Sequence, residues 1–102
     1  MDGVDIIKKE RERQIHEEGW FPEHDDKHVN GELALAACAY AMPLSCDHFA
    51  KEFFKLTGWD ADWFRCNYAN TDSVIRNLAK AGALIAAEID RLNRKKIKDE
   101  DS

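Results

Sequence analysis

The feature of this sequence that most restricts its fold is an apolar stripe at helical spacing in the last third of the chain. Between residues 73 and 95, apolar side chains recur every three or four positions, at Val74, Leu78, Ala81, Ile85, Ile89 and Leu92. This spacing places them on one face of an α-helix, and Thr71 or Asp72 is the expected N-terminal cap. We predict a long amphipathic helix whose stripe faces the core, followed by a charged and frayed tail at 93–102.

A second helix is predicted over residues 31–42, between Asn30 and Pro43. Asn30 is the expected N-terminal cap, and Pro43 ends the helix. The segment is apolar nearly all round and rich in alanine, which is typical of a short helix buried at the centre of a domain. Cys38 lies in this segment and is therefore expected to be an inert thiol of the core.

Two further helices complete the predicted fold. Residues 4–18 favour a helix with a thin apolar stripe, formed by Val4, Ile7 and Ile15, and Gly19 is its natural end. Residues 48–57 favour another, between Asp47 and Gly58. No segment alternates as a strand would, so we predict one all-α domain of four helices over residues 1–102.

The aromatic side chains are concentrated in the two connections that lack helical periodicity. Residues 20–30, which include Pro22, are predicted to be a loop. Residues 59–70 carry Trp59, Trp63, Phe64 and Tyr68, and are predicted to form a Trp-rich loop packed over one end of the helices. At such density, aromatic side chains serve as lids of the core, as subunit contacts or as surfaces on which a ligand stacks.

Composition narrows the class of protein further. The chain has 102 residues, of which 20 are acidic and 15 basic, so a net charge of -5 disfavours non-specific DNA binding. No run of about 18 apolar residues predicts a membrane span, and no signal peptide is apparent at the N-terminus. Three cysteines without CxxC spacing favour a reducing cytoplasm. A domain this small leaves much apolar surface uncovered, so a homodimer is expected.

Four blocks of the sequence carry a family resemblance. Residues 10–28 read ERERQIHEEGWFPEHDDKH, residues 31–41 contain GELA, AA and YA, and the blocks at 59–64 and 78–92 read WDADWF and LAKAGALIAAEIDRL. Together they resemble a family of short phage and prophage proteins. The resemblance implies a helical protein in the cytoplasm of an infected bacterium and specifies no mechanism. The chain departs from the family at Gly58-Trp59-Asp60, where Trp-Pro-Trp is usual, and in the longer segment 43–58.

The leading functional hypothesis is a binding protein for a small anionic ligand, in its most specific form a nucleotide. Trp20 and Trp63 are expected to stack on a base. The phosphates are expected to be held by four cations: Arg11, Arg13, Arg76 and Lys80. Given the phage resemblance, a concrete version of this hypothesis is that the protein sequesters a nucleotide that signals in host immunity. The alternative interpretation of Arg76 and Lys80 is that they lie on a solvated face of the helix and bind no ligand. The candidate ligand-binding residues are Arg11, Arg13, Trp20, His24, Asp25, His28, Glu32, Trp63, Arg76 and Lys80.

Three charged side chains are expected to point inward. Arg11 shares the stripe of Ile7 and Ile15, Glu32 opens the apolar helix, and Glu88 borders the stripe of the last helix. A lone buried charge is costly, so we predict a structural ion pair among Arg11, Glu32 and Glu88. The alternative is that Arg11 grips a phosphate or carboxylate of a ligand.

No cofactor is predicted. If a metal ion binds, the expected ligands are Glu23, His24, Asp26 and His28, since His24 and His28 have a helical i,i+4 spacing. The opposing interpretation is that these polar side chains order the loop through its backbone N–H groups.

Two other functions remain as alternatives. The first is a Mg²⁺-dependent nucleotide hydrolase similar to the MazG-type pyrophosphohydrolases, which use E-E-x-x-E and E-x-x-D helices. Here Glu17-Glu18 lacks the third glutamate, and Glu88 lies two residues from Asp90. The carboxylates of this alternative are Glu17, Glu18, Asp25, Asp26, Glu32 and Glu88. The second alternative is an interaction protein whose aromatic loops grip a host protein.

Overall fold

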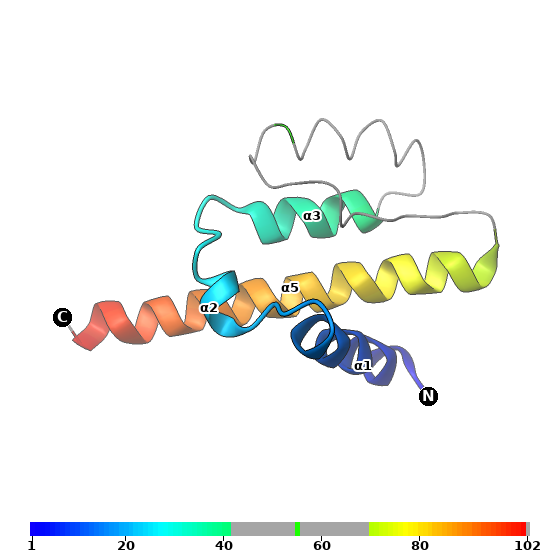
Figure 1. Cartoon of the computed structure of the whole chain (residues 1–102), viewed down its shortest axis with the longest axis horizontal. Coiled ribbons are helices and arrows are strands. Elements are labelled where there is room, and N and C mark those ends of the chain that lie inside the picture. The colour runs from blue at the N-terminus through cyan, green and yellow to red at the C-terminus, as the bar shows by residue number, and fades with distance from the viewer. Residues whose placement is uncertain (42–54, 56–69, 102) are drawn as a thin grey trace.

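The computed structural model describes residues 1–41, 55 and 70–101, which form helices joined by short connections (Figure 1). The helices are α1 (Gly3–His16), α2 (Pro22–Asp25), α3 (Glu32–Ala41) and α5 (Thr71–Asp101). No strand occurs in this described part of the chain, so the all-α prediction is confirmed. The helix predicted at 48–57 and the aromatic loop at 59–69, with Trp59 and Trp63, lie outside the described residues.

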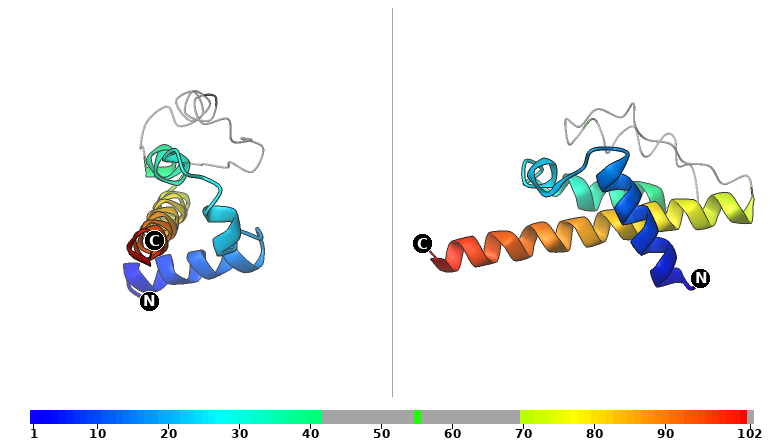
Figure 2. Two further views of the ribbon diagram at one scale, coloured as in Figure 1. Left: turned by 90° about the vertical axis from the view of Figure 1, so that its left-hand side faces the viewer. Right: turned by 60° about the horizontal axis from the view of Figure 1, so that its bottom comes forward.

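Helix α5 is the axis around which the other described helices pack. Figures 1 and 2 show α3 running alongside α5 in the opposite direction, while α1 crosses α5 on another side and α2 lies against it between them. Each of the three thus covers a different part of the same helix. The C-terminal end of α5 extends beyond α1 and α3 (Figure 1).

The apolar core lies between α3 and α5. Leu33 and Leu84 are fully buried, and Tyr40 is nearly so. The remaining contacts come from small side chains, which allow the two helix backbones to approach closely. Trp20, from the connection after α1, packs against the edge of this cluster. The alanines of the cluster are Ala36, Ala37, Ala39, Ala81 and Ala87.

The predicted core stripe of α5 is largely wrong. Ala81 is buried as expected, but Leu78, Ile85, Ile89 and Leu92 are each about half exposed, between 47 and 53 %. The face that α5 buries is instead formed by Asn77, Ala81, Leu84, Ala87 and Arg91. Because α3, α2 and α1 cover α5 through Leu84 and through small and polar positions, its other large aliphatic side chains lie to one side of these contacts.

Two predictions about α3 and α1 also fail. Helix α3 is not buried all round, because Ala34 and Cys38 are exposed, so Cys38 is no core thiol. On α1, Val4 is exposed while Glu10 and Gln14 are buried, so the face that α1 turns inward is more polar than its apolar residues suggested.

The ends of α1 follow local chemistry. Asp2 caps its start, since its carboxylate accepts a hydrogen bond from Asp5 N at 2.9 Å. The helix ends at His16, slightly before the predicted 18. Gly19 then adopts a φ of +74°, the left-handed conformation that glycine accommodates best, and Trp20 N donates back to Gln14 O at 3.1 Å.

Other helix boundaries correct the predictions. Residues 22–25 form α2 where a loop was predicted, because Pro22 is suited to the first position of a helix. Helix α3 begins at Glu32, so the N-cap position is Gly31 and not Asn30.

Asn70 caps α5 in place of Thr71 or Asp72, since Asn70 Oδ1 accepts a hydrogen bond from Ser73 N at 2.9 Å. The expected frayed tail at 93–102 is helical as far as Asp101. Lys95 and Asp99, which lie one helical turn apart in this segment, form an ion pair with an Nζ–Oδ2 distance of 2.9 Å.

Candidate functional site

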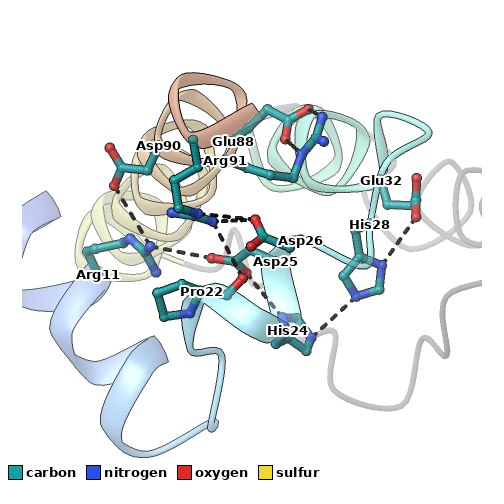
Figure 3. A network of polar contacts seen from close by, with 11 residues as sticks. Arg11, Pro22, His24, Asp25, Asp26, His28, Glu32, Glu88, Asp90 and Arg91 are labelled. Carbon is teal, nitrogen blue, oxygen red and sulfur yellow. Dashed lines mark hydrogen bonds and ion pairs between the residues drawn. The ribbon is translucent and has the colours of Figure 1, made fainter. Parts of the chain in front are cut away.

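The structure divides the predicted ligand-binding residues between two places. Arg13 and Arg76 line a groove between α1 and the N-terminal half of α5, which we call the basic groove. Arg11, Asp25, His24, His28 and Glu32 form a connected series of polar contacts around α2, which we call the polar chain (Figure 3). Trp63 lies outside the described residues.

The basic groove encloses about 380 Å³ and has charged and apolar walls. Lys9, Arg13 and Arg76 supply positive charge, and Glu10 and Asp72 supply negative charge. The apolar part of its lining consists of Met1, Ile6, Ile75 and Ala79. Its volume falls within the roughly 300–1,000 Å³ of small-molecule sites, and its lining is more charged than is usual for such sites.

Arg13 is fixed in place by three glutamates. Its Nε donates to both carboxylate oxygens of Glu10 at 2.8 Å, and its Nη1 lies 2.9 Å from Glu18 Oε1 and 3.6 Å from Glu17 Oε2. The hydrogen bond to Glu10 raises the pKa of Arg13 above its ordinary value. The guanidinium is therefore held rigidly at the edge of the groove.

Lys80 lies close to this group of cations and is electrostatically disfavoured there. Its pKa is lowered, first because burial disfavours the charged ammonium and then because Arg76 adds positive charge, with a smaller contribution from Arg13. Glu10 and Glu18 oppose this shift. The ammonium lies over the ring of Tyr40, with Nζ 5.4 Å from the ring centroid.

The polar chain begins with Arg11, whose side chain is only 14 % exposed. Its Nη2 lies 3.4 Å from Asp25 Oδ2 and 3.9 Å from Asp90 Oδ2. Asp25 itself is 1 % exposed, so this pair links α1 to α2 in a largely dry environment. Arg11 Nη1 is also buried and has no hydrogen-bond partner within the described part of the chain.

The two histidines continue the chain. His24 Nδ1 lies 3.1 Å from Asp25 Oδ1, and His28 Nδ1 lies 3.2 Å from Glu32 Oε2. The two Nε2 atoms face each other at 3.4 Å (Figure 3). The ring of Trp20 stacks on that of His24, with an interplanar angle of 3° and centroids 5.5 Å apart. Trp20 therefore braces the polar chain and is not one of the residues that line the basic groove.

The predicted ion pair among Arg11, Glu32 and Glu88 is wrong in its partners. Glu32 contacts His28 and accepts a hydrogen bond from Asn30 N at 2.6 Å. Glu88 binds Arg91 through two bonds of 2.6 and 3.1 Å, which raises the pKa of Arg91. The expectation that these charges point inward and need partners was correct, but the partners are local residues and Asp25.

The carboxylates expected for a Mg²⁺-dependent hydrolase are each engaged by a basic side chain. Glu17 and Glu18 pair with Arg13, Asp25 with Arg11, and Asp26 with Arg94 at 2.7 Å. Within residues 1–41, 55 and 70–101, no group of three or more His, Cys, Asp or Glu side chains could hold a metal ion. The hydrolase activity stays a prediction, and the described residues do not bring its carboxylates together as ligands of one Mg²⁺ ion. Of the metal-ligand candidates, Glu23 is exposed, and only His24 and His28 approach each other.

Some residues of both sites were missed from the sequence. Glu10 and Gln14 follow Ile7 at i+3 and i+7, so helical spacing alone places them on the inner face of α1. Lys9 in the groove has no comparable signal, and the sequence analysis considers Asp90 only together with Glu88 in the hydrolase pattern.

Comparison of the chain with protein-family models, curated proteins and solved structures gave no match. Among the helices that the structure describes, none combines the length and apolar character needed to cross a membrane. The geometry of the two sites therefore carries the functional interpretation.

Proposed function

We propose that this protein binds a small anionic molecule, in its most specific form a nucleotide, in the basic groove between α1 and α5. The observation that carries the proposal is the convergence of Arg13 from α1 with Arg76 and Lys80 from α5. Arg13 and Arg76 line the groove from opposite helices, and Lys80 lies one turn after Arg76 on α5, with a pKa lowered first by burial and then by the positive charge of Arg76. Arg13 is already paired with three glutamates, so the positive charge of Arg76 is the main attraction for an anion in the groove.

The lining of the groove supports an organic anion over a bare inorganic one. Ile6, Ile75 and Ala79 offer an apolar wall against which a base or another flat group could rest. Arg76, on the second turn of α5, supplies a guanidinium that can bind a phosphate. Phosphates would therefore lie at the Arg76 end of the groove, with the base against the apolar residues.

The resemblance to phage proteins suggests the biological form of this activity. A protein that binds a nucleotide and holds it can lower the concentration of a host immune signal in the cytoplasm of an infected cell. No reaction is needed for that role, and the proposal includes no catalytic residue.

The test is calorimetric titration of the full chain with a panel of linear and cyclic nucleotides, pyrophosphate and inorganic phosphate. Arg76→Gln is expected to weaken binding about tenfold or more, because it removes a charge-assisted contact. Lys98→Gln is the matched control on the same helix, since it removes the same charge away from the groove, and it should bind as the wild type does. Absence of heat across the panel, or equal effects of the two variants, would end the proposal.

We further propose that two copies associate through the exposed aliphatic stripe of α5. Ile85, Ile89 and Leu92 recur at the four- and three-residue spacing of a coiled-coil seam, and Leu78 extends the stripe on the other side of Gly82, where Ile7 of α1 packs; all four are about half exposed. Because a second copy presents the same stripe, the two faces can cover each other around a twofold axis.

Light scattering coupled to size-exclusion chromatography tests this association. The wild type is expected to be a dimer, and Ile85→Asp a monomer, because a charge at the centre of the seam cannot be buried unpaired. Ile97→Asp, at an exposed position of α5 outside the stripe, should leave the dimer intact. A monomeric wild type would contradict the proposal.

A further inference from the structure

The polar chain contains a second arrangement of chemical interest, independent of the basic groove. His24 lies in α2, and His28 follows one turn later, where backbone bonds from Lys27 N to His24 O and from His28 N to Asp25 O continue the turn. Their rings are tilted by 59° with centroids 4.7 Å apart, and their Nε2 atoms are 3.4 Å apart. The two histidines therefore point at a common place.

The tautomers of the two rings follow from their partners. A carboxylate only accepts hydrogen bonds, so the Nδ1 atoms that face Asp25 and Glu32 carry the protons and donate them. Each neutral ring then has its lone pair on Nε2. The two Nε2 atoms lie 3.4 Å apart, within hydrogen-bonding distance, and a metal ion bound by both nitrogens would replace this contact.

We propose that His24 and His28 bind a transition-metal ion of the Zn²⁺ class through their two Nε2 atoms. In a tetrahedral Zn²⁺ site with Zn–N bonds of about 2.0–2.1 Å, two nitrogen ligands lie about 3.3 Å apart. The Nε2 separation of 3.4 Å is therefore already that of a bound pair. Imidazole is a ligand for zinc, copper and nickel, and not for Mg²⁺, which requires oxygen.

The surroundings of the two rings resemble those of metal-binding histidines in general. Such histidines donate their other ring N–H to a carboxylate, which fixes the ring and makes the ligand nitrogen more basic. Asp25 and Glu32 have this role here, and both are buried. Asp25 is held in turn by Arg11, and Trp20 stacks on His24. The pair is thus oriented before any ion arrives.

The site has an accessible side. The His24 and His28 side chains are 26 and 19 % exposed, so an ion can reach them from solvent, and water can supply its remaining ligands. Two protein ligands leave the remaining positions to water, so the site is more open than a catalytic zinc site, which has three protein ligands. None of its residues lines the basic groove, so this inference does not depend on nucleotide binding.

Calorimetric titration of the full chain with ZnCl₂ tests the site, with MgCl₂ as the comparison. One Zn²⁺ is expected to bind, with His24→Ala and His28→Ala each weakening binding by tenfold or more. Glu32→Gln should weaken it by about tenfold, because only the orientation of His28 is lost. His16→Ala is the matched control, since His16 is an exposed histidine at the end of α1, and it should bind as the wild type does.

A second measurement needs no variant and so does not depend on folding of the mutants. In ¹H–¹³C spectra of the wild type, sub-stoichiometric Zn²⁺ should shift the ring signals of His24 and His28 and leave those of His16 in place. Absence of these shifts, no heat with Zn²⁺, or wild-type affinity in either histidine variant would overturn the proposal. An equal response to Mg²⁺ would overturn it too.

Discussion

The two sides of α5 are held by different kinds of contact. Toward α3, the helix buries Leu84 and a series of alanines against Leu33 and Tyr40. Toward α1 and α2, the buried groups are largely polar and include Glu10, Gln14, Arg11 and Asp25. The first interface gains free energy in proportion to apolar area. The second depends on each charge keeping its partner, so it is specific and more easily damaged.

The largest effect is expected on the polar side. Replacing Asp25 by Ala leaves Arg11 buried without its closest counter-ion and removes the partner of His24. Breaking a buried pair in this way costs about 3–5 kcal/mol of unfolding free energy, measured by urea denaturation. The neighbouring Asp26→Ala is the control, because the Asp26–Arg94 pair is partly exposed and should contribute less than about 1 kcal/mol. Equal losses of unfolding free energy in the two variants would mean that burial does not make the Arg11–Asp25 pair more important for stability than the exposed pair.

A somewhat smaller effect is expected on the apolar side. Leu84→Ala removes a fully buried side chain and should lower the unfolding free energy by about 3 kcal/mol. Since no charge is involved, the loss should be the same at low and high salt. Ile97→Ala, at an exposed position of the same helix, should change stability by about 0.5 kcal/mol or less. A salt-dependent loss for Leu84→Ala would contradict this division.

The next test concerns the distance between α1 and α5. A Cβ atom at Gly82 would lie 2.7 Å from Ile7 Cδ1 and 2.8 Å from its Cγ1. Gly82→Ala should therefore cost about 1–2 kcal/mol, despite the higher helix propensity of alanine. In an Ile7→Ala background the contact is gone, and Gly82→Ala should become neutral or stabilising. A double-mutant cycle measures the difference, and additive effects would contradict the close approach.

The smallest effect is a gain in stability. Gln14 is 2 % exposed, and its Oε1 has no hydrogen-bond partner in the part of the chain that the structure describes. Gln14→Met keeps the length of the side chain and removes this acceptor, so the unfolding free energy should rise by about 1 kcal/mol. Glu12→Met, an exposed control on α1, should have little effect. A loss of stability in Gln14→Met would show that Oε1 has a partner.

The sequence predicted the helices better than their faces. Propensity and local chemistry identified three of the described helices, with Gly19 near the end of one. The stripe of α5 was misread because hydrophobicity marks which residues prefer burial, while the burial of Ala81 and exposure of Ile85 depend on where α3 and α1 lie. The periodicity of apolar residues in α5 does not show on which sides of the helix α3 and α1 pack.

The sites were predictable in their components and not in their connections. Burial of Arg11 followed from the apolar stripe that it shares, but its pairing with Asp25 depends on α2, which was predicted to be a loop. Had Pro22 been interpreted as the first residue of a helix, His24 and His28 would have been expected on consecutive turns. Their facing Nε2 atoms also require the fixed positions of Asp25 and Glu32, which only the three-dimensional structure supplies.

The missing side chain at Gly82 has a consequence for the opening next to it. Ala79 of the basic groove lies one turn before Gly82, and Ile6 of the opposite wall adjoins Ile7. The absence of a side chain at Gly82 therefore allows Ile7, and with it α1, to lie close to α5 beside the groove. A methyl group at this position would move α1 away from α5 and widen the basic groove. The size of the ligand that fits could therefore be changed by a substitution at Gly82, which does not line the groove.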